Sequence, residues 1–443
     1  MVDFKLKKSR FDWILMTVFI LLILIGTVSI ISSTVMLESH YRLIRTQILA
    51  IAIGIFLLSF FWVLNYQIFN DQYKYVYSFS ILILLGVLFF GVVDKGSRSW
   101  YRLPFFSIQP SEFARIGIIL FLSSYLSKNY TKISEFSYFL FGLFLLSPFV
   151  FLLLKQPDFS GILITMPVVL GMFYVAGANA FHIMIFATYV FVSSLFPFLW
   201  TIITLNPDLV DNSFISIFFE LADLGWNTII FILFVIVFSY FAWKITVKFK
   251  PFVNGIYFGG MALIIIAGFI TGIFVKKQIK SYQYKRIEVF LSPQKDPRGA
   301  GYNLLQARIA IGSGGLLGKG FFSGTQARFG FVPEMHTDFI ISVVGEEAGF
   351  LGLFFVMSLY AILLYRIKKI AMIARDNYGY FICVGFFFLF LTYFTINLGM
   401  ILGFLPVAGI PLPMLSYGGS NLVSMFIIIG ILQSIYSRRY SIV

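Results

Sequence analysis

Twelve long apolar segments recur along this 443-residue chain and restrict it to one class of fold. A helix needs about 20 consecutive apolar residues to cross the hydrocarbon core of a membrane. Charged residues make up 12% of the chain, about half the share found in soluble domains. The sequence therefore predicts an all-α polytopic membrane protein with about twelve candidate transmembrane helices. The apolar segments lie near residues 13–33, 46–64, 75–93, 112–127, 137–154, 160–177, 181–203, 225–243, 253–275, 337–365, 379–403 and 417–436.

Basic residues are distributed unequally between alternate connecting segments. Lys and Arg gather before the first apolar segment and after the second, fourth, eighth, tenth and twelfth, and the short loops on the other side carry fewer of them. The positive-inside rule places the basic segments in the cytoplasm, so both termini are predicted to be cytoplasmic. Residues 276–335 are basic yet fall on the outer side, and long segments obey this rule weakly.

Charge and residue usage exclude several classes of function. The net charge of +14 suggests anionic lipid head groups or an anionic substrate. Nucleic acid is not expected as a partner, because the basic residues are dispersed between apolar segments. The single cysteine, Cys383, excludes a disulfide or a thiolate metal site within one chain, and the three histidines form no zinc motif.

Residues 331–349 place ionisable side chains at the mouth of an apolar run. Glu334, His336 and Asp338 come just before the run, and Glu346 lies about two turns inside it. Each ionisable group in hydrocarbon costs about 2.5–3.5 kcal/mol, so such groups mark a cavity, a partner or a substrate. Asp338 is therefore the candidate acid for chemistry.

The same acids also allow a purely structural interpretation. Asp338, Ser342 and Glu346 recur at i, i+4 and i+8, which would place them on one stripe of a helix. Asp338 could simply favour the dipole in the first turn of that helix. Glu346 and Glu347 could pair with basic residues on other helices.

Residues 94–115 interleave aromatic and basic side chains. Arg98 and Trp100 fit either an interfacial belt or an aromatic platform beside cations that hold an anionic sugar–phosphate group. Glu112 and Arg115 lie three residues apart and could pair at the top of the next helix.

Two other outer segments contain cations. Lys155 and Asp158 flank a helix start, where they could serve simple anchoring. The glycine-rich residues 312–320 do not form a phosphate-binding P-loop, because Ser313 stands at the position of the first required glycine. They predict a tight turn, or a turn whose N–H groups and Lys319 lie near a phosphate.

These outer segments converge on one surface above the apolar bundle. Arg98, Arg115 and Lys155 supply cations, and Asp338 supplies an acid. A lipid-linked pyrophosphate suits this surface, because its chain can lie in the bilayer while its head group lies among the cations.

Five stretches of the chain carry distinctive motifs: GSRSWYRL with FSIQPSE (96–112), KQPDFSG (155–161), residues 282–320, residues 324–352 with PEMHTDF and GEE, and LPVAGIPLPMLSYGGS (405–420). These motifs resemble those of the SEDS family (shape, elongation, division and sporulation), the peptidoglycan polymerases of the RodA, FtsW and SpoVE type. The sequence GIPLP in the last outer loop looks most like RodA.

The resemblance implies an inverting peptidoglycan glycosyltransferase that polymerises lipid II on the outer face of the bacterial cytoplasmic membrane, for cell elongation and shape. It implies a catalytic role for Asp338 and a class B penicillin-binding protein, a transpeptidase, as partner. A divalent cation, Mg²⁺ or Mn²⁺, held in part by Asp338, is an open option. The expected substrate-binding residues are Trp100, Arg98, Glu112, Arg115, Lys155, Asp158, Lys319, Glu334, His336, Glu346 and Ser416.

Two other functions remain alternatives, and one feature departs from the family. The chain could be a flippase for lipid II, with the acids as a proton relay, or a non-catalytic scaffold of cell-wall synthesis. SEDS proteins usually have ten spans. We therefore expect an inserted helix pair at 181–243, and a long extracytoplasmic loop at 276–336.

Overall fold

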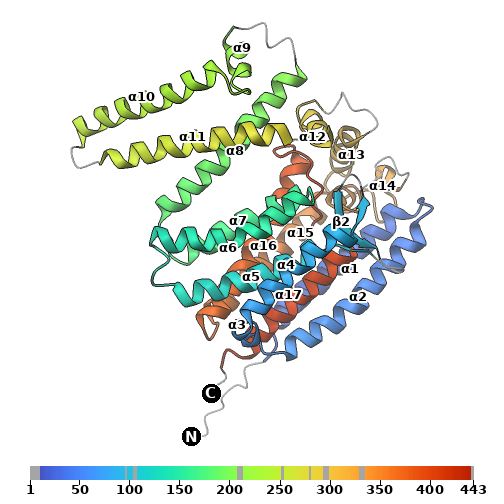
Figure 1. Cartoon of the computed structure of the whole chain (residues 1–443). Helices are drawn as coiled ribbons and strands as arrows, with labels where there is room; N and C mark the ends of the chain where they lie inside the picture. Colours follow the sequence, from blue (N-terminus) through green and yellow to red (C-terminus); the bar gives the residue numbers. More distant parts are fainter. Residues whose placement is uncertain are drawn as a thin grey trace. The chain divides into compact units, whose positions relative to one another are not determined.

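The computed structural model is mostly helical, and it divides into two compact units (Figure 1). The first unit contains residues 1–178 and 296–443, and the second contains residues 179–295. The predicted all-α class is therefore confirmed. The structure describes residues 10–94, 97–102, 107–206, 213–250, 254–278, 281–292, 299–328 and 335–440.

The first unit is a helical bundle with a small antiparallel sheet of three strands in the order β1-β2-β3. Its helices are α1 (Trp13–Thr34), α2 (His40–Val63), α3 (Gln67–Asp71), α4 (Tyr73–Phe90), α5 (Pro110–Asn129), α6 (Phe136–Lys155), α7 (Phe159–Val175), α13 (Ala300–Ser313), α14 (Thr325–Arg328), α15 (Ile340–Met372), α16 (Asn377–Leu402) and α17 (Gly419–Ser437). The strands are β1 (Val92–Asp94), β2 (Ser97–Arg102) and β3 (Ser107–Ile108).

Each of the twelve predicted apolar segments contains a helix. Within the described ranges, ten helices are long and apolar enough to cross a membrane. Helix α7 has only 17 residues, and Glu112, Arg115 and Lys128 lower the hydropathy of α5. The multi-pass class is confirmed, whereas the count of twelve spans stays a prediction.

Helices α5, α16 and α17 form the core of the first unit and pack against one another. The most apolar 18-residue stretches of α16 and α17 are 67% and 89% buried, and α5 is buried on almost every side. Helix α2 covers α17, and α4 and α7 cover α5. Glu112 and Arg115 of α5 are buried and therefore face other helices rather than lipid.

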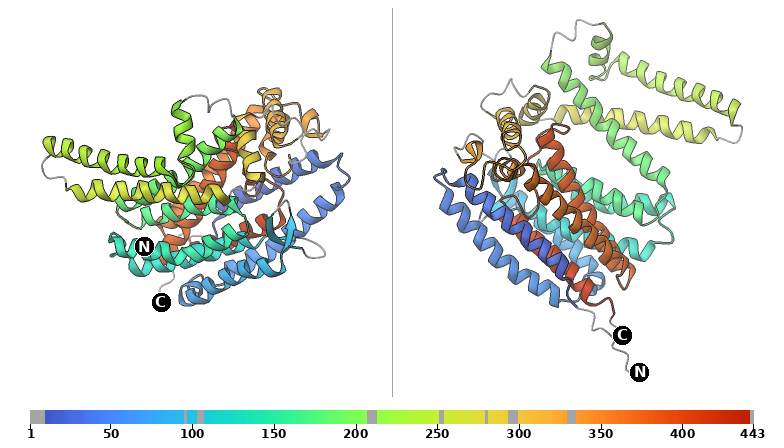
Figure 2. Two further views of the ribbon diagram at one scale, coloured as in Figure 1. Left: turned by 45° about the horizontal axis from the view of Figure 1, so that its top comes forward. Right: turned by 180° about the vertical axis from the view of Figure 1, so that it is seen from behind.

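Both ends of the described chain lie at one end of the first unit (Figures 1 and 2). Phe11 packs on Trp62 with ring centroids 4.9 Å apart, and Arg438 Nη1 donates to the carbonyl oxygen of Trp62 at 3.2 Å. At the start of α17, Ser420 Oγ donates to Ser107 O of β3 at 2.9 Å. Because α17 runs between these contacts, the sheet lies at the opposite end from the termini.

The predicted loop at 276–336 is largely helical where the structure describes it. Helix α11 of the second unit continues to Gln278, and α12 covers Ser281–Leu291. Helices α13 and α14 of the first unit occupy much of residues 299–328. The alternation of apolar and polar residues in this segment suits short surface helices and not only a loop.

The second unit consists of α8 (Ala180–Leu205), α9 (Ser213–Glu220), α10 (Trp226–Phe249), α11 (Gly255–Gln278) and α12. Trp200 and Phe269 are fully buried in its core. A Cβ atom at Gly268 would lie 3.0 Å from Val192 Cβ, so the glycine allows α11 to approach α8 closely. The unit includes the predicted inserted pair together with α11; the status of that pair as an insertion stays a prediction.

Candidate functional site

A charged and hydrogen-bonded cluster lies inside the first unit among α5, α16 and α17. Arg115 Nη1 lies 3.1 Å from Glu112 Oε2 and also donates to the hydroxyl of Tyr393. The Tyr393 hydroxyl donates to Glu112 Oε2 at 2.8 Å, and Asn421 Nδ2 donates to the same oxygen at 3.2 Å. We call Glu112, Arg115, Tyr393 and Asn421 the buried polar cluster.

The start of α5 explains how two charges can be held there. Pro110 occupies the first turn, where its missing N–H is not needed, and Gln109 N donates to Ser420 Oγ at 2.9 Å. Glu112 in the first turn lies near the positive end of the helix dipole. Arg115 is 2% exposed and Glu112 is 6% exposed, so each charge depends on the other for compensation.

Asp158 extends the charged region towards α7. Its Oδ1 caps α7 by accepting from Gly161 N at 2.9 Å, and its carboxylate interacts electrostatically with Arg115. Asp158 Oδ2 and Arg115 Nε are buried and have no hydrogen-bond partner among the described residues. The structure thus brings together three predicted residues: Glu112, Arg115 and Asp158.

Asp338 lies in a turn directly before α15. That helix begins at Ile340, so the prediction of one helical stripe holds for Ser342 and Glu346 but is wrong for Asp338. The side chain is 8% exposed. Asn397 Nδ2 fixes the turn by donating to Asp338 O at 2.9 Å and to Ile410 O at 2.8 Å.

Helix α16 links this turn to the buried polar cluster. Asn397 follows Tyr393 by four residues, which places both side chains on the same face of α16. Tyr393 contacts Arg115, and Asn397 contacts the main chain of Asp338. A displacement of α16 would therefore move both the Glu112–Arg115 ion pair and the turn that carries Asp338.

His336 packs against the segment that leads into α17. Tyr417 N donates to His336 O at 2.8 Å, and the two rings have centroids 5.6 Å apart. Burial raises the pKa of the Tyr417 hydroxyl, and a hydrogen bond with Thr46 and the charge of Arg42 partly oppose this shift. The Tyr417 hydroxyl is therefore neutral at physiological pH.

Glu346 joins the glycine-rich segment and the start of α14 through three donors. Its Oε1 accepts from Lys319 Nζ at 2.7 Å, Thr325 Oγ1 at 3.0 Å and Gln326 N at 3.0 Å. Glu346 is fully buried, and the neighbouring Glu347 accepts a hydrogen bond from Ser32 of α1. Glu346 thus pairs with a basic residue, as expected, but Lys319 lies in the glycine-rich turn and not on another helix.

The glycine-rich turn at residues 315–320 packs against a break in α15 and is hydrogen-bonded to it. Gly349 has φ 64° and ψ −160°, which interrupts the helix. On one side of the break Lys319 N donates to Glu346 O at 3.0 Å, and on the other Phe350 N donates to Gly315 O at 2.9 Å. A Cβ atom at Gly318 would lie 2.1 Å from Glu347 O, so the contact requires glycine.

Arg98 and Trp100 lie on strand β2 at the sheet end of the unit. Arg98 is exposed, and its Nη1 donates to Leu88 O at 3.0 Å. Trp100 is partly buried and pairs through its main chain with Val92. No hydrogen bond among the described residues joins either side chain to the Asp338 turn.

Lys155 and Ser416, two further predicted residues, make no hydrogen bond to the buried polar cluster that the structure records. Lys155 is exposed, with its Nζ 5.4 Å from the ring centroid of Phe151. Ser416 is buried, and its Oγ accepts from Leu412 N at 2.8 Å, so it stabilises the loop before α17. Glu334 lies outside the described residues.

The sequence analysis missed Tyr393, Asn397 and Asn421, which complete the site. Each is a buried polar side chain in or at the start of an apolar helix. A polar residue in a membrane helix normally faces the bundle interior and finds a partner there. Polar residues within apolar runs are therefore the signal in the sequence that indicates Tyr393, Asn397 and Asn421.

The described residues contain no group of three or more His, Cys, Asp or Glu side chains that could hold a metal ion. Cys383 is free and buried in α16. The Mg²⁺ or Mn²⁺ expected from the sequence stays a prediction.

Comparison with known proteins assigns the family. The family model described as "Cell cycle protein", named for FtsW, RodA and SpoVE, matches residues 9–206 and 203–441. The peptidoglycan glycosyltransferase RodA of Treponema pallidum is 32% identical over 440 residues, covering 97% of this chain and 98% of the relative. The peptidoglycan glycosyltransferase MrdB of Escherichia coli is 29% identical over 442 residues, covering 99% and 98%.

Solved structures agree with this assignment. A peptidoglycan synthase complex that coordinates polymerization and crosslinking contains a chain with TM-score 0.64 and 25% identity, covering 97% of this chain and 98% of that one. The crystal structure of the Thermus thermophilus rod shape determining protein RodA has TM-score 0.59 and 22% identity, with the same coverage, and shows a shared fold. The chain belongs to the FtsW/RodA/SpoVE family of cell cycle proteins, the SEDS family.

Proposed function

We propose that this protein is a peptidoglycan glycosyltransferase that polymerises lipid II at the outer face of the bacterial cytoplasmic membrane. The observation that carries the proposal is the match over almost the full length to relatives named as peptidoglycan glycosyltransferases. The ten helices able to cross a membrane suit a lipid-linked substrate. The protein is thus a multi-pass membrane enzyme of cell-wall synthesis.

Asp338 serves as the general base in this proposal. Its carboxylate accepts the proton of the acceptor 4-hydroxyl as that oxygen forms a bond with the anomeric carbon of the donor. The bond from that carbon to the undecaprenyl pyrophosphate oxygen breaks, and a single displacement inverts the configuration. The support is the position of Asp338 on a turn fixed by Asn397, because a base must be held steady relative to the hydroxyl.

Cations at the same end of the unit stabilise the leaving pyrophosphate. Arg98 and Lys155 are exposed and can meet a head group directly. Arg115 is bonded to Glu112 and Tyr393 through Nη1, while its Nε is directed to no acceptor among the described residues. Its role is either direct contact through that edge or support of the site through α16.

We propose that the partner is a class B penicillin-binding protein and that the sheet end faces the outside. A solved relative belongs to a synthase complex in which polymerization and crosslinking are coordinated, which supports a crosslinking partner for this chain. Both termini lie at the same end of the unit, opposite the sheet. This agrees with an even number of spans, which would leave both termini in the cytoplasm.

The test is polymerisation of lipid II by the purified protein, alone and with a class B penicillin-binding protein. Asp338→Asn should abolish glycan chains without loss of folding. Asp71→Asn, an exposed acid at the opposite end of the unit, is the matched control and should remain active. Normal glycan chains from Asp338→Asn would exclude Asp338 as the general base. Transport of lipid II across the membrane without polymerisation would favour a flippase.

A further inference from the structure

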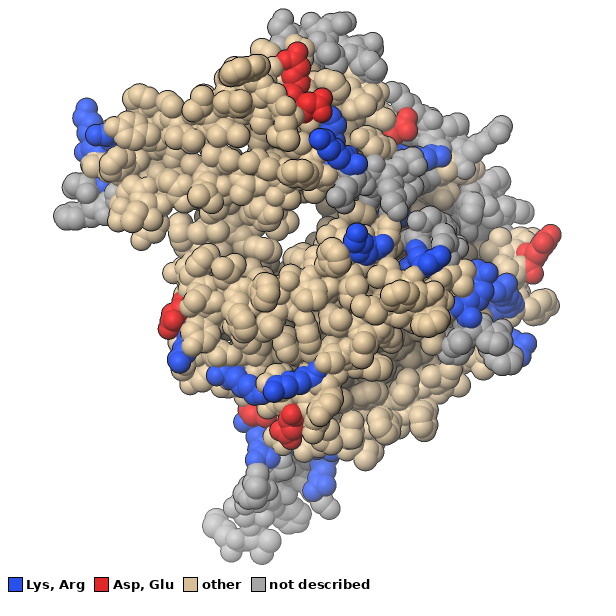
Figure 3. Space-filling model, viewed as in Figure 1, with Lys and Arg blue, Asp and Glu red and all other residues tan. Residues whose placement is uncertain are grey.

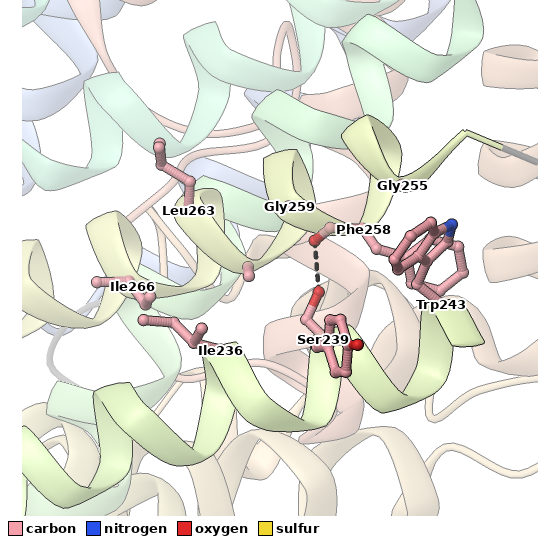
Figure 4. A pocket seen from close by; sticks show the side chains of 10 residues that line it. Ile236, Ser239, Trp243, Gly255, Phe258, Gly259, Leu263 and Ile266 are labelled. Carbon is pink, nitrogen blue, oxygen red and sulfur yellow. Dashed lines mark hydrogen bonds between the residues drawn. The ribbon is translucent and has the colours of Figure 1, made fainter. Parts of the chain in front are cut away.

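An open groove of about 520 Å³ runs between α10 and α11 within the second unit. Ile236 on α10 and Leu263 and Ile266 on α11 line it with apolar side chains (Figure 4). A Cβ atom at Gly259 would meet nothing within 4 Å, so this glycine leaves the space open. Helix α10 is apolar enough to cross a membrane, yet only 6% of its most apolar 18-residue stretch is buried in the protein.

One end of the groove is closed by aromatic and hydrogen-bonded contacts. Trp243 packs so closely on Gly255 that a Cβ atom there would lie 2.9 Å from the indole Cε2. Ser239 Oγ donates to Phe258 O at 2.7 Å and ties the two helices together (Figure 4). Tyr240 also lines this end. Trp and Tyr are typical of the level of lipid head groups.

Three lysines follow this aromatic end along α10. Lys244 Nζ lies 5.7 Å from the ring centroid of Tyr240 and 5.6 Å from that of Trp243. Lys248 comes one turn later and Lys250 follows the helix end, and all three lysines are exposed. Figure 3 shows the positive charge gathered at this tip of the α10–α11 hairpin.

The groove and the lysines beside it are thus complementary to an anionic amphiphile, a molecule with an apolar chain and a negatively charged head group. An apolar channel opens beside two aromatic rings, and a cluster of positive charge continues from its end. The apolar channel can hold a hydrocarbon chain along its length, and the three lysines at its end supply the counter-charge for an anionic head group.

We propose that the α10–α11 groove binds an anionic phospholipid, with one acyl chain against Ile236 and Leu263 and the phosphate at Lys244, Lys248 and Lys250. Basic pockets between membrane helices bind anionic head groups in this way. Each lysine near such a head group raises the affinity about fivefold. Loss of all three should therefore weaken the preference for anionic lipid on the order of 100-fold.

The experiment uses the full chain in nanodiscs of phosphatidylcholine that contain brominated phosphatidylglycerol or, at equal mole fraction, brominated phosphatidylcholine. The fluorescence of Trp243 is isolated as the difference between the wild-type protein and Trp243→Phe. Bromine should quench this signal more strongly on phosphatidylglycerol. The triple variant Lys244→Gln/Lys248→Gln/Lys250→Gln should lose the preference, and Gly259→Leu should reduce quenching by both lipids.

A second triple variant, Lys74→Gln/Lys128→Gln/Lys132→Gln, removes the same charge from exposed positions of the first unit and should keep the preference. Equal quenching of the wild-type signal by both lipids would overturn the proposal, as would equal loss of preference in both triple variants. Unchanged quenching in Gly259→Leu would show that no lipid chain occupies the groove and would overturn the proposal. A smaller oligomer of Gly259→Leu than of the wild-type protein would identify the groove as an interface between protein chains instead.

Discussion

The ion pair between Glu112 and Arg115 can be broken from either side, and the structure sets the expected size of the effect. Arg115 Nη1 makes two hydrogen bonds within the cluster, one to Glu112 and one to Tyr393. A hydrogen bond to a charged group contributes about 1.5–3 kcal/mol. Arg115→Met should therefore lower the free energy of unfolding by about 3–5 kcal/mol, the range for a buried pair that loses one partner.

The double variant separates stability from catalysis. Glu112→Gln should destabilise the protein in the same way as Arg115→Met, because each single change leaves an uncompensated buried charge. Glu112→Gln/Arg115→Met removes both charges and should regain most of the lost stability. Equilibrium unfolding in mixed micelles with SDS, followed by circular dichroism, measures the coupling free energy.

Polymerisation by the stable double variant then decides the role of Arg115. If the guanidinium also meets the leaving pyrophosphate, the double variant should be slower by about 10²–10³ although it is well folded. Full activity of the double variant would show that Arg115 only supports the bundle. Single-variant losses that simply add in the double variant would refute the ion-pair reasoning itself.

Three further predictions concern other parts of the first unit. Arg366 binds the buried carboxylate of Asp12 at 2.5 Å, so Arg366→Met should cost about 3–5 kcal/mol in unfolding experiments and Asp12→Asn in the same chain should restore part of it. Burial and a neighbouring carboxylate raise the pKa of the Tyr66 hydroxyl above its ordinary value of 10. Stability from Tyr66 is thus complete below pH 10 and falls at higher pH as the unfolded chain ionises; Tyr66→Phe should flatten this fall in pH-dependent unfolding. In intact cells a cysteine at Gly299 should react with an impermeant thiol reagent and one at Thr131 should not, and the opposite pattern would invert the topology.

The sequence was sufficient for the class of fold because long apolar runs leave few alternatives. It was less informative at α5, where Glu112 and Arg115 lower the hydropathy of a helix that is buried by other helices. Hydropathy describes contact with lipid, whereas these two charges compensate each other and accept or donate hydrogen bonds with Tyr393 and Asn421, which lie on helices distant in the sequence.

The candidate site shows the same limit. Spacing suggested the pair Glu112–Arg115, because three residues form nearly one turn. Spacing could not identify Lys319 as the partner of Glu346, since 27 residues and a glycine-rich turn separate them. The spacing of Asp338, Ser342 and Glu346 also did not show where α15 begins. It placed Asp338 on a helical stripe, although the helix starts only at Ile340.

The contact between the glycine-rich turn and the break in α15 has a consequence for how this protein can vary. Hydrogen bonds on both sides of Gly349 join residues 315–320 to residues 346–351 in a fixed register. An insertion or deletion of one residue in either partner would shift every one of these bonds. A chimaera with another family member should therefore fold when both segments are exchanged together, and should fail to accumulate when only one of them is exchanged.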